Sequence, residues 1–166
     1  MSLPLHLRDF VSGPCRGPLR GTPYGELRTY ELAPFLAAWP DLHRAALAAL
    51  PCRIDPTAFI DPTAVIGDDV VIGPNARVHE FTTVRKGSVL CADVVIGFNC
   101  EVTRAFIGDG AVLGHRVSVN RSLVGADAHL SANVITPAIH LCRDMRRPDR
   151  EVLIRLPGGL YGCGTP

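Results

Sequence analysis

The feature that most constrains the fold of this chain is an aliphatic residue that recurs at every sixth position. Nine such residues follow one another without interruption between residues 54 and 102. They are Ile54, Ile60, Ile66, Ile72, Val78, Val84, Leu90, Ile96 and Val102. The position four residues after each of them mostly holds a small or β-branched side chain, and Gly or Asp-Pro often follows the aliphatic residue directly.

A period of six residues excludes both a helix and a long flat strand. In an α-helix six residues advance about 600°, so successive aliphatic side chains would point to different faces. In a continuous strand the Gly and Pro residues would interrupt the hydrogen-bond ladder. Short extended segments joined by turns satisfy the pattern, with each aliphatic side chain pointing inward. Three segments then close a triangular coil of about 18 residues, and stacked coils bury a continuous apolar column.

The register of the repeat changes after residue 102. Two steps of five residues replace steps of six, from Val102 to Ile107 and from Val119 to Val124. Two interpretations remain open. Either a corner of the coil is shortened by one residue, or the backbone departs from the regular coil to form a functional site.

Both flanks of the repeat differ from it in composition. Residues 1–28 are rich in Gly, Pro and Arg, and we expect an irregular arm. Residues 29–50 predict helix, with Pro40 in the first turn of a second helix. An apolar side of that helix, which includes Leu42, Ala46 and Leu50, is expected to close the bottom of the coil stack. Residues 1–50 are therefore predicted to be an arm and a helical cap, and residues 51–136 the stack.

The repeat stops after Thr136. Residues 143–150, RDMRRPDR, hold four arginines, and EVLIRL then alternates like a strand before the turn signal Pro157-Gly158-Gly159. We expect residues 137–166 to form a loop and a β-hairpin. Guanidinium groups bind phosphate in a bidentate manner, so Arg143, Arg146 and Arg147 are candidates for holding a substrate phosphate. A run of charges is, however, usually a solvated face.

Composition excludes several classes of protein. The chain has 166 residues, 47% hydrophobic and 20% charged, with a formal net charge of +1. No global attraction to nucleic acid or to an anionic membrane follows, and no run of about 18 apolar residues occurs. The six cysteines are scattered without a CxxC pair, so neither a disulfide framework nor a structural zinc site is expected, and Cys91 and Cys100 are predicted to be small buried apolar groups. We expect a soluble cytoplasmic protein.

The six-residue pattern resembles the hexapeptide-repeat family, whose fold is a left-handed parallel β-helix. The resemblance covers residues 54 to about 136 and implies an all-β fold with a short helical cap at the N-terminus. It also implies a homotrimer with a small-molecule substrate. The stretch VVIGFNCEVTRAFIGDGAVLGHRVSVNRSLVGADAHLSANVIT resembles one branch more closely. That branch comprises the acetyltransferase domains of glucosamine-1-phosphate acetyltransferases and related sugar-1-phosphate nucleotidylyltransferases.

The resemblance to this branch implies acyl transfer from acetyl-coenzyme A to an amino sugar or a sugar phosphate. Its catalytic base falls on His115, at a cleft between subunits, and an imidazole has suitable acidity for that role. Ser118 and Asn120 follow in what we expect to be the same turn, where they are candidates for binding the acceptor. No metal cofactor is expected.

Several positions depart from the pattern of the branch. Ser118 stands where tyrosine is common, Asn120-Arg121 replaces a Gly-Asp pair, and Ala138 replaces an asparagine that helps to position the acyl donor and the developing oxyanion. The further coils of the branch do not follow before Pro166, so either the activity is altered or this chain is a shortened form. A non-catalytic trimeric scaffold or regulatory protein therefore stays open as an alternative.

A third hypothesis is a metal-dependent hydratase. His79 and His115 lie 36 residues apart, a spacing that resembles the gamma-class carbonic anhydrases. The position of the third histidine holds Asn120, which is a poor zinc ligand. The shortened step after Val102 also shifts His115 by one position relative to His79. Both features argue against a metal centre.

Overall fold

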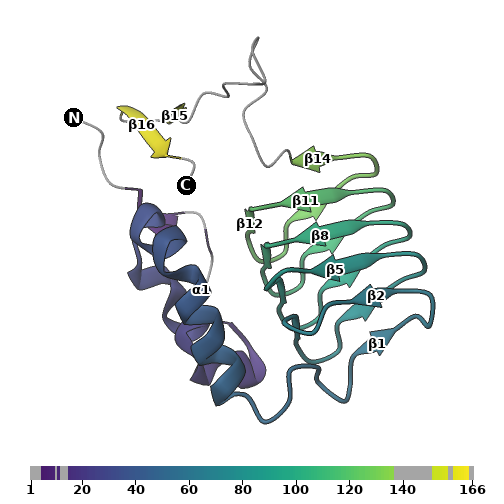
Figure 1. Cartoon of the computed structure of the whole chain (residues 1–166). Coiled ribbons are helices and arrows are strands. Elements are labelled where there is room, and N and C mark those ends of the chain that lie inside the picture. The colour runs from purple at the N-terminus through teal and green to yellow at the C-terminus, as the bar shows by residue number, and fades with distance from the viewer. Residues whose placement is uncertain (1–4, 10, 12–14, 137–150, 157–158, 165–166) are drawn as a thin grey trace.

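The chain folds into a parallel β-helix with a helical layer beside it (Figure 1). The computed structural model describes residues 5–9, 11, 15–136, 151–156 and 159–164, the last two ranges as backbone only. The coils stack for about five turns, each built from three very short strands joined by corners.

The strands form three parallel sheets, one on each side of the triangular coil. The first sheet consists of β1 (Phe59–Ile60), β4 (Arg77–Val78), β7 (Val95–Ile96), β10 (Val112–Leu113) and β13 (His129–Leu130). The second sheet consists of β2 (Val65–Ile66), β5 (Thr83–Arg85), β8 (Glu101–Thr103), β11 (Ser118–Asn120) and β14 (Ile135–Thr136). The third sheet consists of β3 (Val71–Ile72), β6 (Val89–Leu90), β9 (Phe106–Ile107) and β12 (Leu123–Val124). The predicted parallel β-helix is confirmed.

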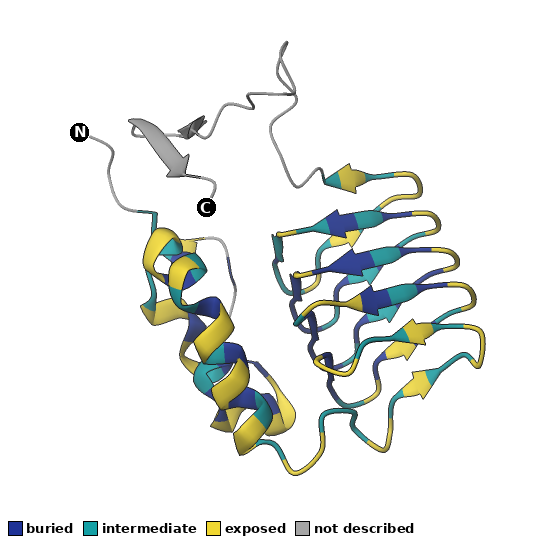
Figure 2. Cartoon of the chain, in the orientation of Figure 1, coloured by how far each residue is buried: buried dark blue, intermediate teal, exposed yellow. Residues whose placement is uncertain are grey.

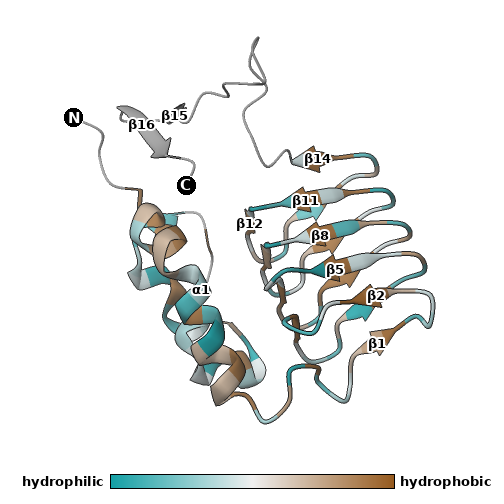
Figure 3. Ribbon diagram, viewed as in Figure 1, coloured by the Kyte–Doolittle hydropathy of each residue, from teal (hydrophilic) through white to brown (hydrophobic). Residues whose placement is uncertain are grey.

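The recurring aliphatic residues form the predicted interior column. In the middle coils Val78, Val84, Leu90 and Ile96 have no exposed surface, and buried apolar residues recur along the strands of these coils (Figures 2 and 3). The inward corner positions hold the small residues. Where one of them is polar, it is paired: the Thr82 hydroxyl donates to the Gly97 carbonyl (2.8 Å) and accepts from the Cys100 N–H (3.1 Å).

The two shortened steps are absorbed at one corner, between the second and third sheets. Thr83 pairs with Glu101, 18 residues on, whereas Glu101 pairs with Ser118, 17 residues on. The inward residues nevertheless stay in register, since Leu90 still pairs with Ile107 and Ile107 with Val124. The corner after β5 uses two residues with positive φ, Lys86 and Gly87, and the corner after β8 uses one, Arg104. The shortened-corner interpretation is therefore correct.

The N-terminal layer consists of 3-10 helices followed by one α-helix. These elements are η1 (Leu7–Asp9), η2 (Gly17–Gly21), η3 (Pro23–Thr29) and α1 (Leu32–Ala49). Pro40 lies inside α1 instead of starting a second helix, although it supplies no N–H to the helical ladder. The buried face of α1, Phe35, Trp39, His43 and Ala46, continues across this position, so tertiary packing keeps the helix in one piece.

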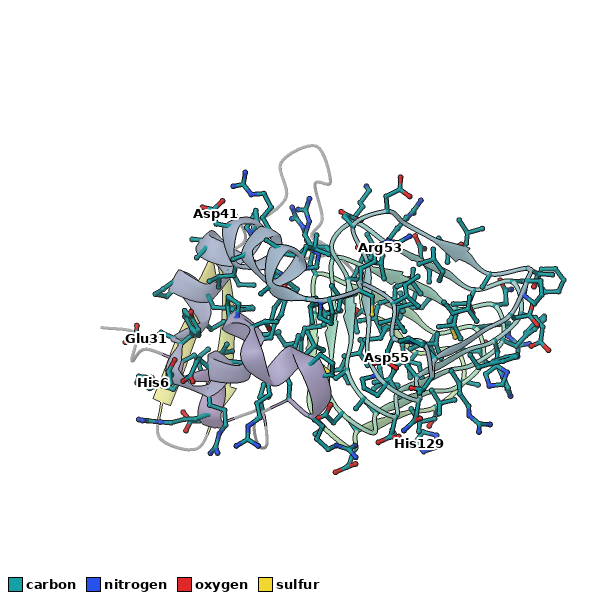
Figure 4. The ribbon with its side chains drawn as sticks, turned by 90° about the horizontal axis from the view of Figure 1, so that it is seen from below. His6, Glu31, Asp41, Arg53, Asp55 and His129 are labelled. Atoms are coloured by element: carbon teal, nitrogen blue, oxygen red, sulfur yellow. The ribbon has the colours of Figure 1, made fainter. Side chains whose placement is uncertain are left out.

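The helical layer covers the third sheet and not the end of the stack. Val71, Val89 and Phe106 point outward from that sheet yet are at most 2% exposed, and the Tyr24 ring packs 5.5 Å from the Phe106 ring. Viewed from below, α1 lies beside the triangular coils (Figure 4). The expectation that this helix closes the bottom of the stack is wrong. The outer surface of the third sheet is apolar, so a helix that covers this sheet buries more apolar area than a helix that closes the bottom of the stack.

A chain of hydrogen bonds joins the helical layer to the β-helix. Trp39 Nε1 donates to Tyr24 Oη (3.0 Å), Tyr24 Oη donates to His43 Nδ1 (2.7 Å), and His43 Nε2 donates to the Asp69 carbonyl (2.6 Å). In a neutral His43 ring the Nε2 proton faces the Asp69 carbonyl and Nδ1 accepts from Tyr24 Oη, so each group in this relay donates in one direction. Burial raises the pKa of the Tyr24 hydroxyl, which keeps it protonated as the relay requires.

The C-terminal elements form a separate antiparallel hairpin. Strand β15 (Glu151–Leu156) pairs with β16 (Gly159–Gly164), with Leu156 opposite Gly159 at the turn. Among the described residues, no helix combines the length and the apolar character needed to span a membrane.

We predict that Ile72→Asp abolishes folding. The Ile72 side chain is 1% exposed within the interior column, and an unpaired carboxylate there costs several kcal/mol, comparable to the whole stability of a domain at about 5–15 kcal/mol. Arg77→Asp is the matched control, because Arg77 is exposed in strand β4 of the first sheet. Circular dichroism during heating should show a cooperative transition for the control alone. A cooperatively melting Ile72→Asp protein would contradict the register.

We also predict that Tyr24→Phe destabilises the docking of the helical layer. The substitution removes the hydroxyl between Trp39 Nε1 and His43 Nδ1 and leaves both buried groups without a partner, at a cost of about 1–3 kcal/mol. Tyr30→Phe is the control, since the Tyr30 hydroxyl makes no hydrogen bond with the described residues and its ring only packs on Phe35. Urea unfolding should separate the two variants; equal stabilities would contradict the relay.

Candidate functional site

An open depression lies on the outer surface of the second sheet, along the corner that joins this sheet to the first. We call it the sheet groove, and its volume is about 410 Å³. It is lined by Phe81, Thr83, Arg85, Asn99, Cys100, Glu101, Arg116, Val117, Ser118 and Ile135. Four coils contribute to it because their outward positions are in register: Thr83 pairs with Glu101, Glu101 with Ser118 and Ser118 with Ile135.

One side of the sheet groove is a closed polar cluster. The Arg85 guanidinium forms an ion pair with the Glu101 carboxylate, and Arg85 Nε donates to Thr103 Oγ1 (3.4 Å). Thr103 Oγ1 in turn donates to Glu101 Oε1 (3.3 Å). The charge of Glu101 is therefore balanced within the β-helix.

The other side of the groove is an aromatic and cationic corner. Phe81 is 60% exposed and Phe98 38% exposed, and their rings meet edge to face with centroids 5.8 Å apart. Phe81 and Arg116 have φ of 56° and 55°, a left-handed conformation that bulky side chains rarely adopt. Arg116 Nε donates to Asn133 Oδ1 (2.9 Å), which orients its guanidinium along this corner.

His115 lies at the same corner, between β10 and β11, and its side chain is exposed. Its Nδ1 accepts a hydrogen bond from the backbone N–H of Phe98 in the coil below, at 3.3 Å. In a neutral ring held in this way, the proton resides on Nε2. The imidazole is therefore presented to solvent as a hydrogen-bond donor. It can accept a proton from a ligand only after releasing the Phe98 contact.

The other predicted site residues are distributed along β11 and beyond it. Ser118 and Asn120 lie in this strand and not in a turn. Ser118 lines the sheet groove near His115. Asn120 follows Val119 at the far end of the strand, where its N–H donates to Thr136 Oγ1 (2.9 Å). Arg143, Arg146 and Arg147 lie outside the described residues.

The two histidines of the metal hypothesis occupy different columns. Val78, Ile96 and Leu113 are in register, so His79 aligns with Gly97 and Gly114, and His115 aligns with Phe98. The His79 column is narrow, because a Cβ on Gly97 would lie 2.5 Å from the Gly114 carbonyl oxygen. Within the part of the chain that the structure describes, no three His, Cys, Asp or Glu residues come close enough together to hold a metal ion.

Sequence reasoning identified one residue of the sheet groove, Ser118, and the histidine beside it. It named Glu101 only as part of a resembling segment, and missed Phe81, Thr83 and Arg116. The sequence could have identified these residues. Once the interior column is assigned, the residue just before each inward residue of the second sheet must point outward, on the same side as its counterparts in the other coils. These are Val65, Thr83, Glu101, Ser118 and Ile135.

These features define a hexapeptide-repeat β-helix protein with a polar and aromatic groove on one sheet. Comparison with protein families matches residues 49–143, more than half of the chain, to the family described as the GMPPB C-terminal domain. The chain belongs to this family. A comparison with curated proteins finds no match.

Three solved structures illustrate what the chain is similar to. Two are histidine variants of the GDP-perosamine N-acetyltransferase from Caulobacter crescentus, in complex with CoA and GDP-perosamine. Their identities are 21% and 20%, their TM-scores 0.31 and 0.28, and the matches cover 75% and 78% of this chain and 63% and 65% of those chains. The third is the acetyltransferase domain of PglB from Neisseria gonorrhoeae FA1090 in complex with acetyl coenzyme A. Its identity is 16% and its TM-score 0.26, with coverage of 61% of this chain and 66% of that chain.

The present chain thus spans less than two thirds of the length of each of these structures. Similarity at this level assigns neither an activity nor a substrate to it.

We predict that Cys100, which lines the groove, resists alkylation. Burial raises the pKa of its thiol, and its Sγ donates to the Gly114 carbonyl (2.9 Å). Each unit of pKa increase lowers the thiolate fraction at neutral pH about tenfold. Cys52 is exposed and serves as the internal control. Peptide mass spectrometry after brief iodoacetamide treatment should find Cys52 modified and Cys100 intact; equal modification would contradict the burial.

Proposed function

We propose that this protein carries out acyl transfer, from a coenzyme A thioester to the amino group of a sugar or sugar phosphate bound at the sheet groove. The observation that carries the proposal is the position of an exposed imidazole, His115, at the edge of a groove that also offers aromatic, cationic and hydroxyl groups. Phe81 and Phe98 suit an apolar ring face, Arg116 suits an anionic group, and Ser118 suits a sugar hydroxyl.

The chemistry requires one base. The acceptor amine attacks the carbonyl carbon of the thioester, the C–N bond forms and the C–S bond breaks. His115 takes the proton that the amine loses, and the departing thiolate takes up a proton to leave as free coenzyme A thiol. The Phe98 N–H holds His115 Nδ1 in the unliganded protein, so the proposal includes a rotation of the imidazole toward the acceptor when substrate binds.

The proposal includes assembly into a homotrimer, with the groove facing a neighbouring subunit. The exposed apolar side chains around the groove support this part. Phe81, Val65 and Ile135 are 60%, 61% and 69% exposed on the second sheet and its corner. Apolar side chains gathered on one face commonly mark an interface between proteins.

A non-catalytic scaffold is the second candidate, and a specific observation favours it. His115 Nδ1 already accepts the Phe98 N–H, and the carboxylate of Glu101 already pairs with Arg85, so both groups have structural roles in the unliganded protein. In this case the groove serves only to join subunits or partner domains, and the chain consumes no thioester.

Replacement of His115 by alanine separates the two candidates. General-base catalysis contributes about 10²–10⁴-fold, so His115→Ala should lower kcat by about that factor and leave the melting temperature unchanged. The assay measures free thiol released from acetyl-coenzyme A with a panel of amino sugars and their phosphates as acceptors. His129→Ala is the matched control, since His129 is exposed on the first sheet, away from the groove.

The outcomes are distinct. Thiol release by the wild type and the His129 variant, with loss in the His115 variant, supports acyl transfer. Release that survives in His115→Ala removes the base from the proposal. If no acceptor elicits release while light scattering finds a trimer, the scaffold takes the place of the enzyme.

A further inference from the structure

A second corner of the β-helix carries positive charge that neither the fold nor the sheet groove uses. Lys86, Arg104 and Arg121 follow the ends of β5, β8 and β11, at the corner between the second and third sheets. All three side chains are exposed. We call these three residues the basic column.

The three residues stack directly above one another. The Arg104 N–H donates to the Arg85 carbonyl (3.3 Å), and the Arg121 N–H donates to the Thr103 carbonyl (3.1 Å). Since Arg85 precedes Lys86 and Thr103 precedes Arg104, these bonds place one member of the column in each of three successive coils. Neighbouring strands are separated by about 4.8 Å, so the column spans about 10 Å.

The backbone at this corner does not favour long cationic side chains. Lys86, Arg104 and Arg121 have φ of 55°, 47° and 46°. This left-handed conformation favours Gly and Asn, and other residues adopt it at some energetic cost. The corner between the third and first sheets follows that preference, and its residues with positive φ are Asn75, Asp93, Gly110 and Asp127. The turn geometry therefore does not explain three consecutive cations.

Internal ion pairing does not explain them either. Among the described residues, Lys86, Arg104 and Arg121 form no salt bridge, whereas the adjacent Arg85 is paired with Glu101. The nearest acidic positions in sequence register are Asp68 and Asp69, one coil below Lys86. Cations on successive coils, whose strands lie about 4.8 Å apart, repel one another, and an anion that bridges them relieves this repulsion.

We propose that the basic column binds a ligand with two or more linked phosphates, such as the diphosphate of a nucleotide or of coenzyme A. Two guanidinium groups offer paired N–H donors to phosphate oxygens, and Lys86 adds a third charge. The span of three coils exceeds the reach of a single phosphate, so linked phosphates engage more of the column. Thr103 and Asn120, directly before Arg104 and Arg121, provide polar groups beside it.

This site is distinct from the sheet groove, although Arg85, which lines the groove, directly precedes Lys86. The aromatic side of the groove lies at the corner between the first and second sheets, next to His115, and the basic column lies at the opposite edge of the second sheet. The proposal therefore stands or falls separately from acyl transfer, because its readout is binding and not turnover.

The test uses the double variant Arg104→Asn, Arg121→Asn. Asparagine tolerates positive φ, so the melting temperature should stay the same or rise while the charge is removed. Titration calorimetry with inorganic pyrophosphate at low ionic strength should show binding that weakens by about tenfold for each cation lost. Arg77→Thr is the control, because Arg77 is exposed in strand β4 of the first sheet and threonine suits a strand.

Binding of other phosphate ligands tests which part of the ligand the column recognises. Orthophosphate should bind more weakly than pyrophosphate, and added salt should weaken binding of both. Tighter binding of ADP or of coenzyme A than of pyrophosphate identifies which source of the diphosphate is recognised. Pyrophosphate binding that is absent in the wild type, or equal in the wild type and the double variant, overturns the site. Equal binding of orthophosphate overturns the requirement for linked phosphates.

Discussion

The whole structure depends on the register of hydrogen bonds between successive coils. Each strand of two or three residues is too short to be stable alone, and it exists because the coils above and below supply its partners. The register places one aliphatic side chain of each strand in the interior, and in the middle coils these side chains are completely buried. It also fixes which outward side chains lie side by side, so any site on the surface is a set of residues about one coil apart.

The same register explains why both proposed sites lie at corners. Corner residues are not paired within the sheets, and many of them adopt positive φ, so their side chains can vary without disturbing the interior. The corner between the third and first sheets uses Asn, Asp and Gly, the residues that this backbone conformation favours. The corner beside the sheet groove carries Phe81 and Arg116 besides Asn99 and Asn133, and the corner of the basic column carries Lys86, Arg104 and Arg121. Departures from the backbone preference thus mark the two places where we propose ligands.

The sequence predicted the β-helix and its inward-facing residues, because both follow from the six-residue period. It left open whether the two steps of five residues shorten a corner or form a functional site, and only the register of the strands decides for the corner. It did not predict where α1 packs. An apolar helix face indicates that the helix packs against a partner, but it does not identify the partner. The partner is the third sheet, whose outward side chains Val71, Val89 and Phe106 are apolar. The prediction that Pro40 starts a second helix is wrong for a related reason. The preference of proline for a first helical turn is outweighed by the burial of Trp39 and His43 on either side of it. The hydrogen bond of His115 could not be predicted from the sequence either, because the partner of its Nδ1 is a backbone N–H in another coil.

The shortened corner also connects the fold to the basic column. After β5 the corner contains both Lys86 and Gly87, and the glycine lies against the His43 ring of the helical layer. In the next two coils the second of these positions is deleted, so Arg104 and Arg121 lead directly into Ala105 and Ser122. The deletion removes the permissive glycine and keeps the cation, although a glycine or asparagine at the retained position would satisfy the same turn with less strain. Both shorter corners hold a cation at the position with positive φ, where the turn alone favours Gly or Asn. This is the strongest reason to regard the column as a binding feature.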